Sequence, residues 1–547
     1  MLSTTLIKSN TVAKYVFNTY STVAVLTYWF VISLQKVSKD ITRECPQGSI
    51  CGPLLWNIAF NAFLDKVNNS NVIAYADDVL ILLGGRSRAD LELKGNHLLN
   101  DIFNWGPRLK LHFNPNKTKA IVFNKSGQLN LYLRVPHIKM NNTTIKVGKT
   151  LKYLGVTLDF RLSWDQHIDY IANRTRLIFQ AFSQVAKNKW GPSSNAMNAV
   201  YDCIYLSIVT YACGTWGWAV RNVHPKRKLI SSQRRALLNI TKAFRTAPNR
   251  SIQVIARKPP IDLTILQHRK FHLIQRGEYI DSPQYPNIPH CDRLEKPYPF
   301  HHTLCPGHDN TIHTNNSLLT NINIYTDGSK NTNTVGCSFV VYVNNQESFF
   351  QCYCLHNNCT IFQAELLAIK MAVSWTNDNL TATCAHIHTD SLSASQIIDS
   401  NNLHPLATEI RNLINMASNN FIISWVRAHQ GNIGNEKADA LAKRAAGDST
   451  LPIIYSKLSR QTLRHILWEE TLQQWQTLWI NNNNSITFQF IPDLKHFSPF
   501  TGSSLTTILP NSSLIMGSLQ ATFPGLPTGT LISALLVKKG RHFALHF

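Results

Sequence analysis

Acidic residues are scarce in this chain of 547 residues, which carries 31 Asp and Glu against 54 Lys and Arg and has a formal net charge of +23. Such an excess of positive charge favours binding to polyanions and makes that binding sensitive to salt. The basic residues gather at 108–119, 146–152 and 224–228. This balance points to a nucleic acid as partner, with a merely soluble basic surface as the plainer alternative.

Paired cysteine motifs of the kind that hold structural zinc are also missing. The eleven cysteines are dispersed, and Cys352, Cys354 and Cys359 form a C-x-C-x4-C pattern without a second half. We interpret them as reduced, buried or incidental thiols of an intracellular protein, in the nucleus or the cytoplasm. A stretch with histidines and cysteines at 290–308 leaves a zinc site open as an alternative.

Charged residues are absent from residues 15–35, where aliphatic and aromatic side chains dominate. A single membrane helix is conceivable for such a stretch. Its hydroxyl and amide residues, however, dilute the hydropathy, and its β-branched and aromatic residues suit strands equally well. We therefore expect an atypical apolar N-terminus at 1–40, and a membrane span at 15–35 is the less favoured alternative.

Although acidic residues are few, four of them lie in four separate motifs within one region: Asp327, Glu365, Asp390 and Asp439. The alternation of apolar and polar residues before Asp327 and Asp390 predicts two strands that each end at an acid. Helical spacing around Glu365 and Asp439 predicts two helices that each begin near an acid. His429 lies in the loop ahead of the last helix. One acid alone is most often a solvated surface charge, but four in correctly typed elements favour a site.

A cluster of carboxylates is unstable unless cations neutralise it. Two Mg²⁺ ions about 4 Å apart would do so, and they would also activate a water and stabilise the leaving oxygen in phosphodiester cleavage. Mn²⁺ is an alternative ion, and nothing in the sequence indicates a small-molecule cofactor. The loop histidine, His429, suits proton transfer or product release.

These motifs resemble those of type 1 ribonuclease H over roughly residues 320–447. The resemblance implies a five-stranded mixed sheet with flanking helices. It implies Asp327, Glu365, Asp390 and Asp439 as metal ligands and His429 as an auxiliary catalytic residue. It also implies the RNA strand of an RNA/DNA hybrid as the substrate, with Glu365 near the 2′-hydroxyl side of that strand.

A second acidic motif, Tyr75-Ala76-Asp77-Asp78, lies between two apolar runs. The pattern predicts a hairpin with carboxylates at its tip, where vicinal acids favour a bound cation. An ordinary polar turn is the alternative. Because Pro46-Gln47-Gly48 precedes the motif, we favour the functional interpretation.

Together these motifs resemble the palm of reverse transcriptases, and more narrowly that of jockey/I-type non-LTR retrotransposons, with element RNA as template. The resemblance implies metal binding by Asp77 and Asp78, proton donation to pyrophosphate by Lys117, and a primer-grip hairpin around Tyr153 and Gly155. Gln47 and Gly48 would contact the template and the incoming nucleotide.

The palm departs from that family in one respect. A complete site needs a third metal-binding Asp on an earlier strand, yet Asp40 and Glu44 are the only acids before Pro46. Two carboxylates do not fix two ions and a triphosphate. We therefore expect no DNA synthesis by this chain alone and apolar palm strands left without partners. A non-catalytic relic that binds nucleic acid remains the alternative to an enzyme.

The fold class expected from these patterns is a multidomain α/β (α+β) protein. Helical spacing dominates 164–275, where Arg234, Arg235 and Arg245 are candidate phosphate contacts or else plain surface arginines. The predicted domains are the apolar N-terminus (1–40), a partial palm with primer grip (41–160), a helical thumb or connection (161–280), a linker (281–318), the ribonuclease H domain (319–447) and a helical, then poorly structured tail (448–547).

Overall fold

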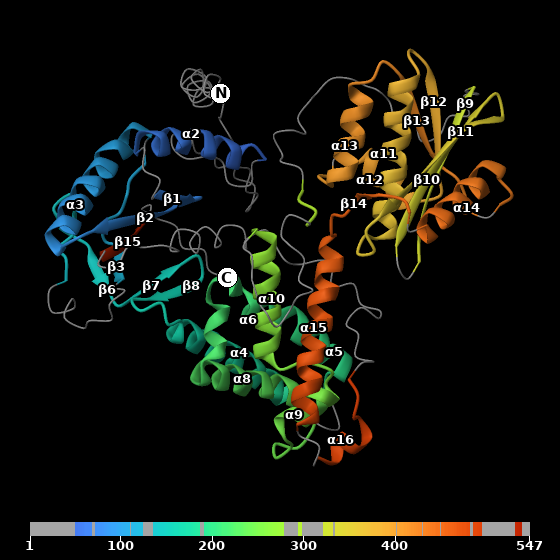
Figure 1. Cartoon of the computed structure of the whole chain (residues 1–547). Coiled ribbons are helices and arrows are strands. Elements are labelled where there is room, and N and C mark those ends of the chain that lie inside the picture. The colour runs from blue at the N-terminus through green and yellow to red at the C-terminus, as the bar shows by residue number, and fades with distance from the viewer. Residues whose placement is uncertain are drawn as a thin grey trace, which may run out of the picture. The chain divides into compact units, whose positions relative to one another are not determined.

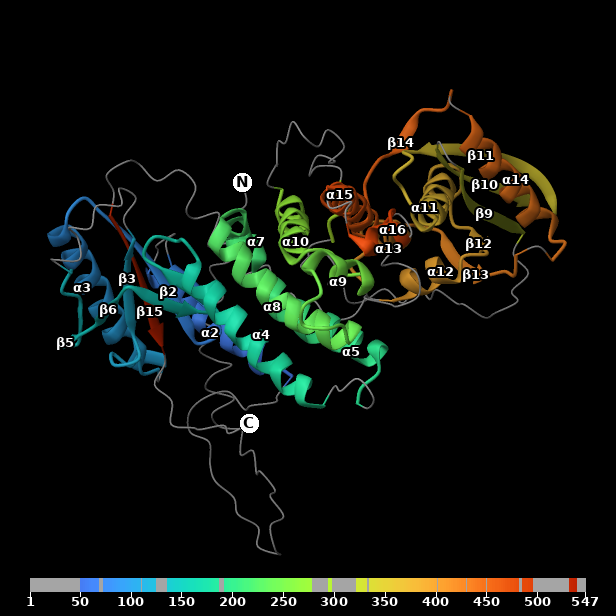
Figure 2. The same cartoon turned by 90° about the horizontal axis from the view of Figure 1, so that it is seen from below.

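The computed structural model of the chain describes residues 50–67, 72–109, 111–123, 135–185, 191–277, 294–297, 321–331, 334–400, 402–428, 430–448, 450–481, 485–494 and 531–538. It forms two compact units (Figures 1 and 2). The first joins residues 1–256 with 500–547, and the second spans residues 257–499. The predicted domain boundaries inside these units stay predictions.

The first unit begins with a helix and a sheet around the predicted acidic hairpin. Strands β1 and β2 pair antiparallel with Tyr75 opposite Asp78, so the hairpin forms as predicted. Helix α3 covers one face of the sheet, where Leu91, Leu99 and Ile102 pack with the inner residues of β2. The elements are α2 (Gly52–Val67), β1 (Val72–Tyr75), β2 (Asp78–Gly85), α3 (Arg88–Trp105), η1 (Gly106–Leu109), β3 (Lys119–Phe123), β4 (Lys139–Met140), β5 (Thr143–Thr144), β6 (Lys146–Gly148), β7 (Thr150–Tyr153) and β8 (Val156–Asp159).

A strand from the far end of the chain completes this sheet. Strand β15 (Leu531–Lys538) lies between β2 and β3 in the order β1-β2-β15-β3-β6. The sequence predicted unpaired apolar strands here and a poorly structured tail. The pairing of β15 with both neighbours is therefore a structural result that the sequence did not indicate.

The rest of the first unit is helical. Helices α4 and α8 lie side by side, tied by the hydrogen bond from Ser183 to Asn239 (2.9 Å) and the ion pair of Lys228 with Asp169. The helical segment between Tyr201 and Trp216 is interrupted, because Ala212 has a φ of 52°. The elements are α4 (Asp165–Val185), α5 (Ser194–Val200), the π-helix η3 (Tyr201–Leu206), α6 (Ser207–Thr210), α7 (Cys213–Trp216), η4 (Gly217–Arg221), α8 (Val223–Thr241) and α9 (Asn249–Ile255).

The second unit is built on a mixed sheet in the order β13-β12-β9-β10-β11-β14. The five strands that the resemblance implied are joined at one edge by short β14, which pairs parallel to β11. Helices α11 and α14 cover opposite faces of the sheet (Figure 1). The elements are β9 (Ile322–Lys330), β10 (Val335–Val343), β11 (Gln346–Leu355), α11 (Ile361–Asn379), β12 (Cys384–Thr389), α12 (Leu392–Asp399), α13 (Pro405–Asn415), β13 (Asn420–Trp425), α14 (Ile433–Gly447) and β14 (Ile453–Tyr455).

Segments before and after this sheet in the chain also belong to the second unit. Helix α10 (Ile261–Gln275) packs on α15 (Arg460–Ile480) through Phe271, Leu463 and Leu467, and Lys270 pairs with Glu470. A short helix, α16 (Ile486–Phe490), follows. Cys359 is buried, and its thiol lies 3.7 Å from the carbonyl oxygen of Tyr455.

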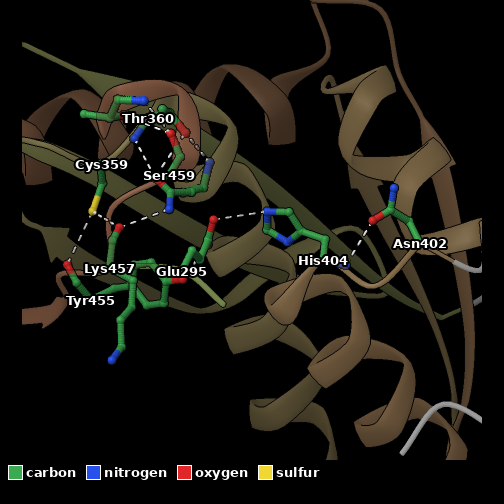
Figure 3. A network of polar contacts seen from close by, with 10 residues as sticks. Glu295, Cys359, Thr360, Asn402, His404, Tyr455, Lys457 and Ser459 are labelled. Carbon is green, nitrogen blue, oxygen red and sulfur yellow. Dashed lines mark hydrogen bonds and ion pairs between the residues drawn. The ribbon is translucent and has the colours of Figure 1, made fainter. Parts of the chain in front are cut away.

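A buried carboxylate fastens the segment 294–297 to the sheet (Figure 3). The backbone N–H of Glu295 donates to the carbonyl of Leu458 (2.8 Å), and the Tyr455 hydroxyl donates to its Oε1 (2.6 Å). His404 Nε2 lies 3.5 Å from Oε2 of the same carboxylate. The segment 294–297, which precedes the sheet in the sequence, and residues 455–458, which end it, are therefore held together at this carboxylate.

Several predicted features lie outside the described residues: the apolar stretch 15–35, Gln47, Gly48 and His429. In the described part of the chain, no single helix has the length and hydropathy that crossing a membrane requires. One pair of helical segments, Ser194–Thr210 and Cys213–Arg221, meets that test only together and is bent by 57°.

Candidate active site

Three of the four predicted acids of the second unit meet at one point. Asp327, Glu365 and Asp390 each offer a carboxylate oxygen, and these oxygens all lie within 4.8 Å of one another. They come from β9, α11 and the residue directly after β12. The structure therefore brings together acids that are separated by up to 63 positions in the sequence, as the strand and helix patterns predicted.

The strand that carries Asp327 differs from the prediction. It does not end at the acid but continues to Lys330, and Asp327 pairs with Ser338 of β10. The next residue, Gly328, allows α11 to approach closely, because an added Cβ would lie 2.8 Å from the backbone nitrogen of Glu365. The backbone N–H of Gly328 also hydrogen bonds to the carboxylates of Asp327 and Glu365.

Burial and mutual repulsion keep two of these acids from ionising easily. The pKa of Asp327 is raised to about 7, first by burial and then by the charges of Asp390 and Asp439. The pKa of Glu365 is raised well above its usual value, first by burial and then by Asp327 and Asp390. Glu365 Oε2 is buried and has no hydrogen-bond partner among the described residues. Such an orphaned oxygen in an all-carboxylate cluster fits a divalent cation.

The fourth acid, Asp439, is held close to the cluster by tight packing of α14 on the sheet. Gly336 leaves no space for a side chain between β10 and α14, and the Ser338 hydroxyl donates to the carbonyl of Ala438 (2.7 Å). Asp439 is close enough to Asp327 for its negative charge to raise the pKa of Asp327. Asp439 itself is paired with Lys443 at 2.7 Å.

Two neighbours of the site were not singled out from the sequence. Lys443 lies four residues after Asp439 in a helix, a spacing that predicts an ion pair and could have identified it. Trp425 ends β13, where its indole N–H donates to the backbone carbonyl of Asp390 (3.0 Å) while its side chain stays 47% exposed. No local pattern indicates this contact, because it depends on the parallel pairing of β12 with β13.

In the first unit, the hairpin tip that carries Asp77 and Asp78 lies close to the predicted primer-grip hairpin. Tyr153 of β7 is buried, and its pKa is raised to about 12 by burial and then by the charge of Asp78. Gly155 turns between β7 and β8 with a φ of 81°. Lys117 is exposed in the turn ahead of β3. The roles predicted for these residues stay predictions.

The three candidate phosphate-binding arginines differ in their surroundings. The guanidinium of Arg234 donates to the carbonyls of Ala247 and Arg245 and to Asn249. Arg235 makes one long contact with Gln180 (3.5 Å), and Arg245 is exposed. Arg234 therefore fastens the segment 245–249 to α8, whatever contact it makes with a phosphate.

Arg234→Ala is expected to loosen that segment, because three carbonyl or amide acceptors lose a charged donor. We expect the free energy of local opening to fall by about 2 kcal/mol, which accelerates amide hydrogen exchange in α9 roughly 30-fold. Arg235→Ala, on the same helix, is the matched control and leaves the exchange unchanged. Equal exchange in both variants would contradict the structural role of Arg234.

Two family models match the chain. Residues 7–158 match "Reverse transcriptase (RNA-dependent DNA polymerase)", and residues 320–447 match "RNase H". The first match takes in the apolar stretch 15–35, which was predicted to lie apart from the palm.

Proteins of known mobile elements are similar to the chain over less than half of its length. The 115 kDa protein of the type-1 retrotransposable element R1DM of Drosophila melanogaster is 31% identical over 42% of the chain. The RNA-directed DNA polymerase of the mobile element jockey from the same species is 24% identical over 36% of the chain. In both cases the alignment spans only 22% of the relative.

Among solved structures, RNase H1 of Halobacterium salinarum is 20% identical, with coverage of 23% of this chain and 98% of its own and a TM-score of 0.21. The two family matches and the relatives agree with the two groups of motifs described above. The chain therefore contains a reverse transcriptase segment and an RNase H domain, and its relatives are the polyproteins of R1 and jockey non-LTR retrotransposons.

Proposed function

We propose that the second unit is a metal-dependent ribonuclease H that cuts the RNA strand of RNA/DNA hybrids. The observation that supports this most directly is that carboxylate oxygens of Asp327, Glu365 and Asp390 lie within 4.8 Å of one another, and that one buried oxygen of Glu365 has no partner in the described part of the chain. Acids without a functional role are not expected to lie so close together, because the repulsion between their charges destabilises the fold. The basic composition of the chain suits a polyanionic substrate.

The ligand set consists of carboxylates alone, which suits Mg²⁺ or Mn²⁺ rather than zinc. Asp327 and Asp390 would hold the ions most directly, with Glu365 and Asp439 completing the set. When bound, a pair of such ions activates water and stabilises the leaving oxygen of a phosphodiester. Lys443 holds the Asp439 carboxylate through its ion pair and must share that carboxylate with an incoming ion.

Recognition of the RNA strand would come from groups around the metal ligands. Glu365 accepts from the Gly328 N–H, and its free oxygen is suited to a 2′-hydroxyl, which only RNA offers. The exposed ring of Trp425 beside Asp390 offers a flat apolar surface to a sugar or base. In the first unit, Asp77 and Asp78 would bind metal and Lys117 would donate a proton to pyrophosphate. Tyr153 and Gly155 would contact a primer on the element RNA template.

The test is a cleavage assay of the full chain in Mg²⁺ with three duplexes of one sequence: an RNA/DNA hybrid, double-stranded RNA and double-stranded DNA. We expect cuts in the RNA strand of the hybrid alone, and none when EDTA replaces Mg²⁺. Equal cleavage of all three duplexes would contradict the selectivity for hybrids. Tight binding to the hybrid without cleavage would favour the non-catalytic relic.

A further inference from the structure

Strands β2 and β3 of the first unit are not neighbours in their sheet. Strand β15 separates them and runs antiparallel to both. Without β15, the facing edges of β2 and β3 would each present unpaired N–H and C=O groups next to a buried core. With β15 in place, residues Val79 to Leu83 of β2 are at most 6% exposed.

The sequence of the inserted segment suits a central strand. Residues 531–538 read Leu-Ile-Ser-Ala-Leu-Leu-Val-Lys, in which six of eight residues are apolar. A strand covered on both faces is expected to show such a nearly continuous apolar run. The register places Leu535 opposite both Ile81 of β2 and Ala120 of β3, two positions of the buried core.

We propose that the gap between β2 and β3 is a binding site for one antiparallel apolar strand, and that residues 531–538 of the same chain occupy it. The C-terminal part of the chain then acts as a strand donor to the reverse transcriptase segment. Main-chain hydrogen bonds on both edges give such a site its affinity, and the alternating side-chain positions give it its register.

The register has a consequence for the acidic hairpin. The strand ends at the tip, with Lys538 opposite Asp78. The residue opposite Asp78 on the adjoining strand is thus a lysine rather than a third acidic residue.

Engineered disulfides in the full chain test the register. In antiparallel pairing, one of two successive opposed pairs has the short Cα separation, about 4.5 Å, that a disulfide accepts. We therefore use two double variants, Val79→Cys with Val537→Cys and Leu80→Cys with Leu536→Cys. The control is Val79→Cys with Leu536→Cys, whose positions lie on opposite faces. After mild oxidation, peptide mass spectrometry identifies the bond among the native cysteines.

An intrachain bond in at least one opposed pair, and none in the control, supports the proposal. A bond that forms only between two chains shows that a second copy fills the site, and this overturns the assignment. No bond in either opposed pair overturns it as well.

Amide hydrogen exchange provides a second measurement that does not depend on thiols. Leu535→Pro removes a backbone donor from a central strand, and Leu535→Ile is the matched control that keeps strand propensity. We expect exchange in β2 and β3 to rise at least about tenfold with proline and to stay unchanged with isoleucine. The helices α4 and α8 of each variant report whether the unit stays folded. Unchanged protection of β2 and β3 in the folded proline variant would refute the proposal.

Discussion

Asp390→Asn is expected to reduce Mg²⁺-dependent cleavage of an RNA/DNA hybrid by on the order of 1,000-fold or more. The substitution keeps the size of the side chain but removes the charge from one of the three carboxylates that converge within 4.8 Å. Loss of an outer-sphere partner of a metal already costs 10- to 100-fold in many enzymes. A direct ligand should cost more, because it carries part of the stabilisation of the transition-state charge.

The same variant should fold normally, which separates loss of chemistry from loss of structure. The hydrogen bond from the Trp425 indole goes to the backbone carbonyl of Asp390, and the following helix is capped by the Ser391 hydroxyl. Neither contact uses the Asp390 carboxylate. Its removal also relieves the repulsion that raises the pKa values of Asp327 and Glu365. In EDTA, the variant should therefore be at least as stable as the parent chain.

The control is Asp399→Asn, at the exposed end of helix α12, only nine positions away. It changes the net charge by the same amount and should leave the cleavage rate unchanged. Initial rates on one hybrid at saturating Mg²⁺ give the comparison. Full activity of Asp390→Asn would show that the acid cluster is not the catalytic site.

The sequence predicts those helices and strands that are determined by interactions between residues close together in the chain. Alternating apolar residues before Asp390 and helical spacing after Ile361 depend on neighbours in the chain, and both elements formed as predicted. The position of Asp327 inside its strand was not predicted, because Gly328 and Ser329 are typical turn residues. They continue the strand since β10 offers partners to the end at Lys330.

Long-range pairing accounts for what the sequence did not reveal. The residues near 531 do not indicate that this segment pairs with β2 and β3, two strands that lie more than 400 positions earlier in the chain. The contact of Glu295 with Tyr455 likewise joins two segments that each lack periodicity. In both cases the stabilising partner is hundreds of residues away or in another element, so local propensity carries no information about it.

Divalent metal should stabilise the second unit in a manner that depends on pH. The folded pKa of Asp327 is raised from 3.8 to about 7, and that of Glu365 is raised as well. An acid whose pKa is higher in the folded state than in the unfolded state stabilises the folded protein. This contribution is fully present below the unfolded-state pKa and is lost as the pH rises through the folded-state pKa. For Asp327 alone, the loss between about pH 4 and pH 7 is on the order of 4 kcal/mol.

Partly buried histidines have the opposite effect of pH on stability and must be separated from this one. Burial lowers the pKa of His388 to about 4, and those of His386 and His404 are also lowered. Their contributions are complete above the unfolded pKa and are lost as pH falls through the folded value. The absolute melting profile therefore mixes two trends. The difference between Mg²⁺ and EDTA isolates the carboxylates, since these histidines contact Ser424, Asn323 and Glu295 rather than the cluster.

The melting temperature of the second unit can be followed by calorimetry of the full chain. Near pH 4, where the acids are protonated, a tenfold increase in millimolar Mg²⁺ should raise this melting temperature only slightly. The rise should grow steadily up to about pH 7, because binding then restores the stability that the ionised cluster has lost. Asp327→Asn should flatten that growth, whereas Asp378→Asn, an exposed acid on α11, should leave it intact. A shift that is equal at pH 5 and pH 8 would mean that Mg²⁺ binds elsewhere, because only a site with raised carboxylate pKa values gains affinity across this interval.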